Sequence, residues 1–179
     1  MPRLLAGVPL DKTIVLVDTC TIIEAVRTGV WNRLTGAVRI ETVEKCREEA
    51  LAGDTASFGY IVVTPDDLQR ISTVHVVPQL EVDQYLAHDT DAVDMDEGEQ
   101  MLFAHAFARL QCGDHLWVLT SSDKATIRAA VRIDIQDALH SLEELTDAVD
   151  ARPRPALDYQ HETKFLQRFR TEYLLELKK

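Results

Sequence analysis

The stretch IVLVDTCTII, residues 14–23, decides the fold of this chain. Four apolar residues run without alternation into Asp18, and a second apolar stretch follows within a few residues. An unbroken apolar run of this length is typical of a strand buried on both faces of a parallel sheet. The sequence therefore predicts a buried strand over residues 13–18 that ends in a carboxylate, with Asp18 or Thr19 capping the next helix.

The rest of the chain alternates short apolar strands with helices. Further strands are predicted at residues 37–40, 72–78, 116–120 and 132–135, and helices at 31–34, 42–53, 65–71, 81–88, 96–111, 121–131 and 136–149. Strands that alternate with helices indicate an α/β fold around a parallel sheet.

Length and composition are those of an ordinary globular domain. The chain has 179 residues, of which 46% are hydrophobic and 27% charged. No apolar run approaches the ~20 residues that a membrane-spanning helix needs, so we expect no membrane association. Pro9 and Asp11 interrupt the apolar start of the chain, which therefore lacks a signal-peptide core. We expect a cytoplasmic protein.

Cysteine usage and net charge limit the function classes. Cys20, Cys46 and Cys112 are far apart and form no CxxC pair, which argues against a disulfide framework and a zinc site. The formal net charge of −11 offers no general attraction to nucleic acid, and it suits a basic partner or simple solubility. Carboxylates gathered around a metal ion would account for part of this excess.

Four acidic residues fall where a parallel sheet would bring them together. Asp18 and Asp123 each follow a predicted strand, and Glu44 and Glu99 each fall in the first turn of a predicted helix. Ligands of open parallel sheets bind beyond the carboxyl ends of the strands, so we expect these four side chains at one rim.

Four converging carboxylates would repel one another and raise each other's pKa values. A divalent cation removes that penalty, and oxygen ligands favour Mg²⁺ or Mn²⁺. Such a site suits metal-assisted hydrolysis of phosphodiester bonds.

The ordered set of motifs resembles the PIN domain family over roughly residues 13–149. The motifs are IVLVDTCTIIEA, a glutamate early in a helix, DEGEQMLFAHA and LTSSDKATIRAA. The resemblance implies a three-layer α/β/α fold and a metal-dependent ribonuclease, many of whose relatives are VapC-like toxins of toxin–antitoxin pairs. It also implies an RNA substrate, an antitoxin or other protein partner, and a homodimer. Asp18, Glu99 and Asp123 match the family's metal ligands.

The second and fourth motifs depart from the family pattern. The stretch TVEKCREEAL offers Glu44, Glu48 and Glu49, and we expect Glu44 to act because it is nearest to the strand end. Ser122 stands where an acid often accompanies the last aspartate, which leaves fewer ligands for a second metal. The candidates to support the ligands, metal-bound water or phosphate are Thr19, Asp96, Ser122 and Glu48.

Other function classes fit the sequence less well or remain open. A haloacid-dehalogenase-like phosphatase needs a second aspartate two residues after Asp18, where this chain has Cys20. Neither G-x-x-x-x-G-K-[ST] nor G-x-G-x-x-G is present. The open alternative is a catalytically weak or inactive PIN-like scaffold that binds a protein partner, which the acidic charge and the extra terminal helix fit.

The proline-interrupted stretch ARPRPAL, residues 151–157, divides the predicted organisation. We expect a PIN-like nuclease domain over residues 1–150, followed by a joint and an amphipathic helix within residues 151–179. The apolar residues of that helix on roughly one side are Phe165, Leu166, Phe169, Tyr173 and Leu174. We expect this face to pack back onto the same chain; the alternative is a second copy or a partner protein.

Overall fold

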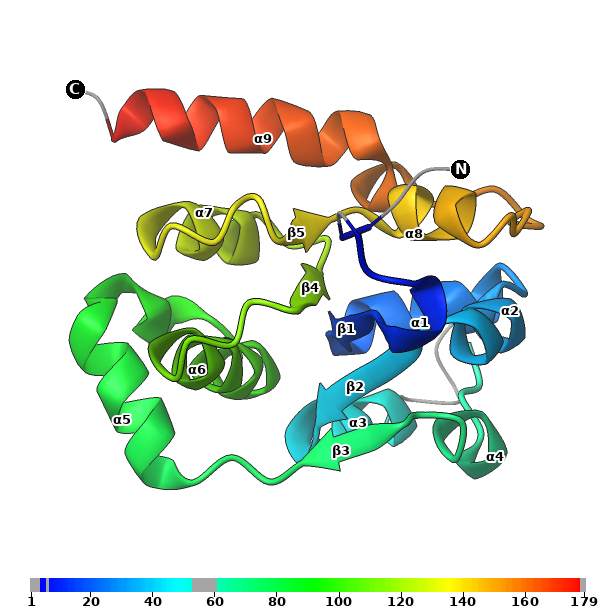
Figure 1. Ribbon diagram of the computed structural model, residues 1–179, viewed down its shortest axis with the longest axis horizontal. Coiled ribbons are helices and arrows are strands. Elements are labelled where there is room, and N and C mark those ends of the chain that lie inside the picture. Colours follow the sequence, from blue (N-terminus) through cyan, green and yellow to red (C-terminus); the bar gives the residue numbers. More distant parts are fainter. Residues whose placement is uncertain (1–3, 6, 53–60, 178–179) are drawn as a thin grey trace.

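Five parallel strands form the centre of the protein (Figure 1). The computed structural model describes residues 4–5, 7–52 and 61–177. The strands are β1 (Ile14–Val17), β2 (Arg39–Val43), β3 (Thr73–His75), β4 (Trp117–Thr120) and β5 (Leu139–His140), and their order in the sheet is β3-β2-β1-β4-β5. The first strand is therefore central, as its unbroken apolar run predicts, and it pairs in parallel with β2 and β4.

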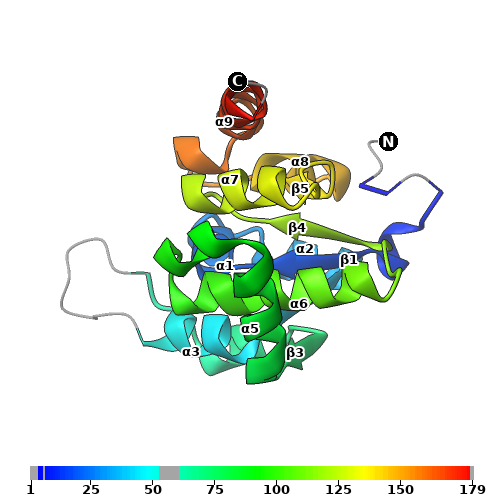
Figure 2. The same cartoon turned by 90° about the vertical axis from the view of Figure 1, so that its left-hand side faces the viewer.

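Helices cover both faces of the sheet, which confirms the three-layer α/β/α architecture. Figures 1 and 2 show α5, α6 and α7 on one face and α1, α2 and α8 on the other. The helices are α1 (Thr19–Arg27), α2 (Trp31–Ala37), α3 (Glu44–Leu51), α4 (Pro65–Leu68), α5 (Gln79–His88), α6 (Glu97–Gln111), α7 (Lys124–Arg132), α8 (Leu142–Ala148) and α9 (Thr163–Glu176). Short 3-10 turns are η1 (Leu10–Lys12), η2 (Thr90–Asp94) and η3 (Tyr159–His161). No helix in the described residues is long and apolar enough to cross a membrane.

Alternate residues of the strands fill two separate cores. Leu16 lies in the core shared with α5, α6 and α7, whereas Val15 and Val17 lie in the core shared with α1, α2 and α8. All three side chains are almost completely buried. This two-sided burial explains why β1 reads as a continuous apolar run rather than an alternating one.

The strand predicted at residues 132–135 is wrong, and the helix predicted at 136–149 begins later, because α8 spans Leu142–Ala148. Residue 132 ends α7, and Asp134 adopts a left-handed conformation with φ of 61° just beyond it. Ile133 and Ile135 are buried on either side of this turn, so the alternation that suggests a strand is a helix end anchored in the core. The last strand is β5, and Ser141 then starts α8 through a capping box with Glu144.

The second strand also extends further than residues 37–40. It runs from Arg39 to Val43, so residues 42–43 belong to the sheet and not to the helix predicted there. The buried Glu41 is consequently a strand residue, and Glu44 is the first residue of α3.

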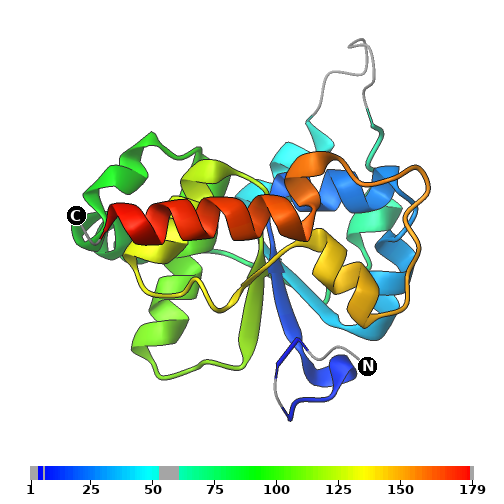
Figure 3. The ribbon, with the colours of Figure 1, turned by 90° about the horizontal axis from the view of Figure 1, so that it is seen from above.

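The helix α9 packs back onto the same chain, as expected. It lies over α7 and α8 and along β5, the edge strand of the sheet (Figures 1 and 3). The Arg170 guanidinium donates to the carbonyl of Leu139 at 3.4 Å. The buried residues on its apolar face are Phe165, Leu166, Phe169 and Tyr173, and Leu174 is partly buried. The helix thereby protects a sheet edge that would otherwise be open to pairing with another chain.

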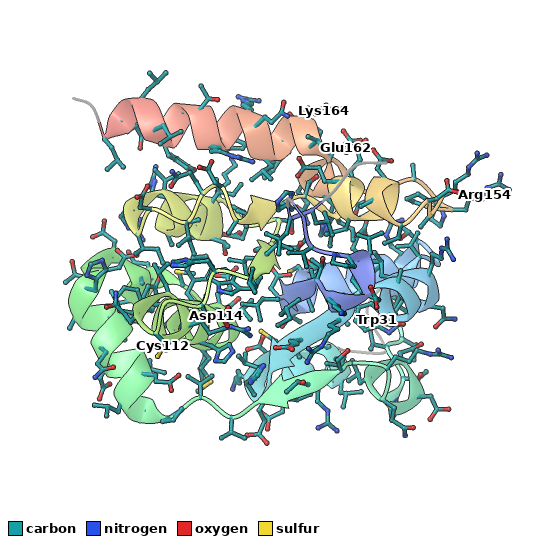
Figure 4. All side chains as sticks on the ribbon, viewed as in Figure 1. Trp31, Cys112, Asp114, Arg154, Glu162 and Lys164 are labelled. Carbon is teal, nitrogen blue, oxygen red and sulfur yellow. The ribbon has the colours of Figure 1, made fainter. Side chains whose placement is uncertain are left out.

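The segment between α8 and α9 is fastened to α1 by a buried charge. Glu24 binds both the Nε and the Nη2 of Arg27 at 2.6 Å, and it accepts the backbone N–H of Asp158 at 2.7 Å. The backbone N–H of Arg154 donates to the carbonyl of Thr28 at 2.9 Å, while the Arg154 side chain projects outward (Figure 4). The C-terminal segment is thus built into the surface of the helix that Asp18 begins.

A second buried carboxylate fixes α6 to the sheet. Glu41 accepts from Arg109 of α6 at 3.1 Å and from His75 of β3 at 2.8 Å. Arg109 also pairs at 2.7 Å with Asp114, which lies in the loop after α6 (Figure 4). Because the buried Glu41 is satisfied by these partners, the contact holds in place the helix that carries Glu99.

Candidate functional site

Asp18 lies immediately after β1 and is 2% exposed. One carboxylate oxygen accepts the backbone N–H of Thr21 at 2.7 Å, which makes Asp18 the N-cap of α1. The other accepts the hydroxyl of Ser121, which follows β4. Burial raises the pKa of the Asp18 carboxyl, and the hydrogen bonds from Ser121 and Thr21 offset part of this rise.

Asp123 lies at the neighbouring strand end, as expected. It is the N-cap of α7, where its carboxylate accepts the N–H of Ala125 at 2.6 Å, and its side chain is exposed. Its own N–H donates to the hydroxyl oxygen of Ser121 at 3.5 Å. Ser121 therefore contacts both Asp18 and the backbone of Asp123, which joins the two aspartates through one side chain.

Glu99 lies in the first turn of α6 and is 9% exposed. It accepts the hydroxyl of Thr126 at 3.1 Å, so it faces the first turn of α7. Burial, and then the charges of Asp96, Asp123 and Asp18, raise the pKa of the Glu99 carboxyl to about 8. Hence the other two expected ligands, Asp18 and Asp123, both act electrostatically on Glu99.

The same negative charges also affect the thiol of Cys20. Its pKa is raised to about 12, first by lost solvation and then by the charges of Asp18, Glu99, Asp96 and Asp123. Three of the four predicted site residues, Asp18, Glu99 and Asp123, therefore lie within electrostatic range of Cys20, together with Asp96. Asp96 caps α6 by accepting the N–H of Glu99 at 2.8 Å, which holds Glu99 in the first turn.

The structure does not place Glu44 with these residues. Glu44 and Glu48 are on one side of α3, where they line a shallow hollow with Arg47 and Leu51. Nearness to the strand end does not bring Glu44 into the site, because Glu44 is exposed and the buried face of α3 is formed by Cys46 and Ala50.

Glu49 is the residue of α3 that faces the site. Its carboxylate accepts the hydroxyl of Thr19 at 2.8 Å. A Cβ placed on Gly98 would lie 2.5 Å from the same oxygen, so any larger residue at position 98 would require the Glu49 carboxylate to move. The charges of Asp18 and Glu49 also raise the pKa of the buried Cys46 thiol, after the larger effect of burial.

A helical pattern in the sequence could have identified Glu49. Cys46 and Ala50 are the buried residues of α3, and position 49 borders that face while positions 44 and 48 lie away from it. Thr19, expected from the sequence to contact a metal-bound water or a phosphate, donates its hydroxyl to Glu49. Ser122 lies in the turn between β4 and α7 and is 4% exposed.

One buried histidine near the site was not singled out from the sequence. His161 in η3 is 3% exposed, and burial lowers its pKa, an effect that the charges of Glu24, Asp18 and Asp158 partly offset. It lies in η3, in the C-terminal segment that packs against α1.

The donor set fits a hard divalent cation. Asp18, Glu99, Asp123 and Glu49 offer carboxylate oxygens, and the raised pKa of Glu99 indicates more negative charge than the site accommodates without a counter-charge. In the residues that the structure describes, no three His, Cys, Asp or Glu side chains are gathered closely enough to hold an ion as they stand. Closure around a cation therefore requires rotation of a carboxylate, for which the exposed Asp123 has room.

The assignment of Glu49 leads to a matched test on α3. In a metal-dependent cleavage assay, we expect Glu49→Gln to lower the rate by at least about tenfold, because it removes a charge beside Thr19 and Gly98. Glu44→Gln and Glu48→Gln remove the same charge from the outer side and are expected to keep the parental rate. An equal loss in Glu44→Gln would contradict the assignment.

Comparison with known proteins adds no relative. No protein-family profile, curated protein or solved structure matches this chain. The functional conclusion therefore depends on the order of the motifs and on the geometry of the acidic site.

Proposed function

We propose that this protein is a Mg²⁺- or Mn²⁺-dependent endoribonuclease of the PIN type that hydrolyses phosphodiester bonds in RNA. The observation that carries the proposal is the buried Glu99, whose pKa is raised to about 8 among Asp96, Asp123 and Asp18. A carboxyl group in this environment is stabilised by a cation, and the motif order supports phosphodiester chemistry.

Asp18, Glu99 and Asp123 would have different roles in such a site. Asp18 is held rigidly by Thr21 and Ser121, and Glu99 by Thr126, so both offer oxygens at fixed positions. Asp123 caps α7 with one carboxylate oxygen and is exposed, so a substrate or ion can reach it. A bound Mg²⁺ or Mn²⁺ would supply Lewis-acid activation of water and of the scissile phosphate.

The proposal extends to the cellular location and the partners of the enzyme. An RNA substrate and three free cysteines favour the cytoplasm. The VapC resemblance supports a role as the toxin of a toxin–antitoxin pair, with an antitoxin protein as the partner and a homodimer as the active form.

Metal dependence is the direct test of the proposal. The purified protein is treated with EDTA, dialysed and incubated with labelled RNA, with and without Mg²⁺ or Mn²⁺. We expect cleavage only after the metal is restored, with internal cuts rather than stepwise removal of nucleotides from an end. Cleavage that persists at full rate in EDTA would exclude the mechanism.

A protein-binding scaffold is the second candidate. The specific observations in its favour are the net charge of −11 and the position of Glu44 and Glu48 on the outer side of α3, where they add to an acidic surface. Melting temperature separates the two candidates: Mn²⁺ stabilises a protein that binds it in the folded state, whereas a scaffold without a site gains nothing.

A further inference from the structure

A row of exposed cations begins directly after Asp123. Lys124 is the first residue of α7 and Arg128 follows one turn later on the same face, so the two are separated by ~6 Å along the helix. Arg168 on the adjoining α9 is also exposed. These three residues are named the α7–α9 strip.

The helix α9 holds these cations with its aromatic side chains. Helices α7 and α9 lie side by side (Figure 3). The Lys124 ammonium lies 4.4 Å from the ring centroid of Phe169, and the Arg128 guanidinium lies 4.4 Å from that of Tyr173. Arg168 lies 5.1 Å from the Phe169 ring centroid. Cation–π contacts orient a cation without neutralising it, which leaves its charge available to an anion.

The strip differs from Arg109 and Arg132, which carboxylates neutralise. Arg109 and Arg132 are partly buried and bind Glu41 and Asp89, respectively. In the described part of the chain, Lys124 and Arg168 have no carboxylate within ion-pair distance. Arg128 has one, Glu176, at 3.4 Å between two half-exposed groups, an ion pair worth little in water.

The strip continues into a hollow of about 270 Å³ between α7, η2 and α9. Arg128, Arg132, Tyr173, Asp91 and Glu176 are among its lining residues. Since acidic and basic groups are mixed there, the hollow suits a neutral polar group such as a nucleobase better than a phosphate.

We propose that Lys124, Arg128 and Arg168 bind the phosphate backbone of a single RNA strand and lead it to Asp123. This inference rests on the proposed function and gives the C-terminal helix a role in it. Lys124 and Arg128, one turn apart on α7, are spaced like successive phosphates of one strand, and Arg168 adds a third cation from α9. In a chain with a net charge of −11, such a local group of cations attracts a phosphate backbone that the rest of the surface repels.

Salt dependence of binding tests the strip separately from catalysis. The full-length protein is titrated with a short fluorescent single-stranded RNA in Ca²⁺ at several salt concentrations, and binding is followed by fluorescence anisotropy. For single strands, the slope of log K against log salt becomes shallower by about 0.7 for each phosphate that the protein no longer neutralises. We expect that change for each of Lys124→Gln, Arg128→Gln and Arg168→Gln, and a change of about 2 for the triple variant.

Arg154→Gln is the matched control, because it removes one positive charge from an exposed side chain at the other end of the molecule (Figure 4). We expect its slope to equal that of the parent. Circular dichroism establishes that each variant is folded. An unchanged slope in the triple variant, an equal change in Arg154→Gln, or tighter binding of duplex than of single-stranded RNA would overturn the strip.

The outcomes separate the strip from the nuclease. If the parent cleaves RNA in an Asp18-dependent manner while the triple variant keeps the parental slope, the proposed function stands and the strip fails. If binding requires the three cations but no RNA is cleaved in Mn²⁺, the strip stands and the nuclease fails.

Discussion

Replacing Asp18 by asparagine is expected to lower the rate of metal-dependent RNA cleavage by at least about a hundredfold. Asp18 is the most buried of the proposed ligands, and both of its oxygens are already fixed by Thr21 and Ser121. Asparagine has the same shape and caps helices well, so the start of α1 is preserved. What is removed is the negative charge that attracts the cation and holds it in place.

The measurement compares initial cleavage rates of the parent and of Asp18→Asn in Mn²⁺, with melting temperatures recorded for both proteins. Asp66→Asn serves as a control, because it makes the same substitution at an exposed position on α4. If a folded Asp18→Asn protein cleaves RNA at the parental rate, Asp18 is not a ligand. If Asp18→Asn loses activity and also melts at a much lower temperature, Ser121→Ala is the further variant to measure. It removes a hydrogen bond to Asp18 but keeps the Asp18 charge, and it is expected to lower the rate less than Asp18→Asn does.

Replacing Glu99 by glutamine is expected to stabilise the metal-free protein at pH 8 and above by about 2–4 kcal/mol. The pKa of Glu99 is raised to about 8 in the folded protein, compared with 4.5 for an unperturbed glutamate. Below pH 4.5 both states hold the proton, and the full stability is present. As the pH rises from 4.5 through 8, the unfolded state releases the proton first, so the folded state loses stability over that range. Glutamine keeps an acceptor for the Thr126 hydroxyl and has no charge to bury.

Urea denaturation at pH 4.5 and pH 8.5, in EDTA and in Mn²⁺, checks this expectation. The gain of Glu99→Gln over the parent should be small at pH 4.5 and largest at pH 8.5 in EDTA. Addition of Mn²⁺ should stabilise the parent more than the variant and so reverse part of the difference. Glu97→Gln, on the exposed side of the same turn, should show neither effect. Equal stability of Glu99→Gln and parent at pH 8.5 would show that Glu99 is not destabilised by its surroundings.

The loss of activity expected for Asp18→Asn and the gain in stability expected for Glu99→Gln have the same physical reason. An acidic site of this kind costs stability when it is empty of cations, and its function requires that cost. Two hydrogen bonds, from Ser121 and Thr21, stabilise the charged form of the buried Asp18. The charged form of Glu99 is instead destabilised by the charges of Asp96, Asp123 and Asp18.

The sequence by itself determined the fold class and the positions of Asp18, Glu99 and Asp123 at strand ends and first helical turns. The unbroken apolar run of β1 is buried on both faces, so its local composition already specifies a central strand and the position of Asp18 beyond it. Asp123 and Glu99 are likewise fixed by local rules, since each lies where a strand or a loop meets the first turn of a helix.

Only the tertiary structure decided where the last strand lies and what covers the sheet edge. For the glutamates of α3, the helical pattern already favours Glu49 over Glu44 and Glu48, and the tertiary contacts with Thr19 and Gly98 then place Glu49. The last strand, β5, is two residues long, too short to carry a periodic pattern, and its pairing with β4 specifies it. The cations of the α7–α9 strip come from helices far apart in the sequence, and only the packing of α9 on α7 makes them neighbours around Phe169.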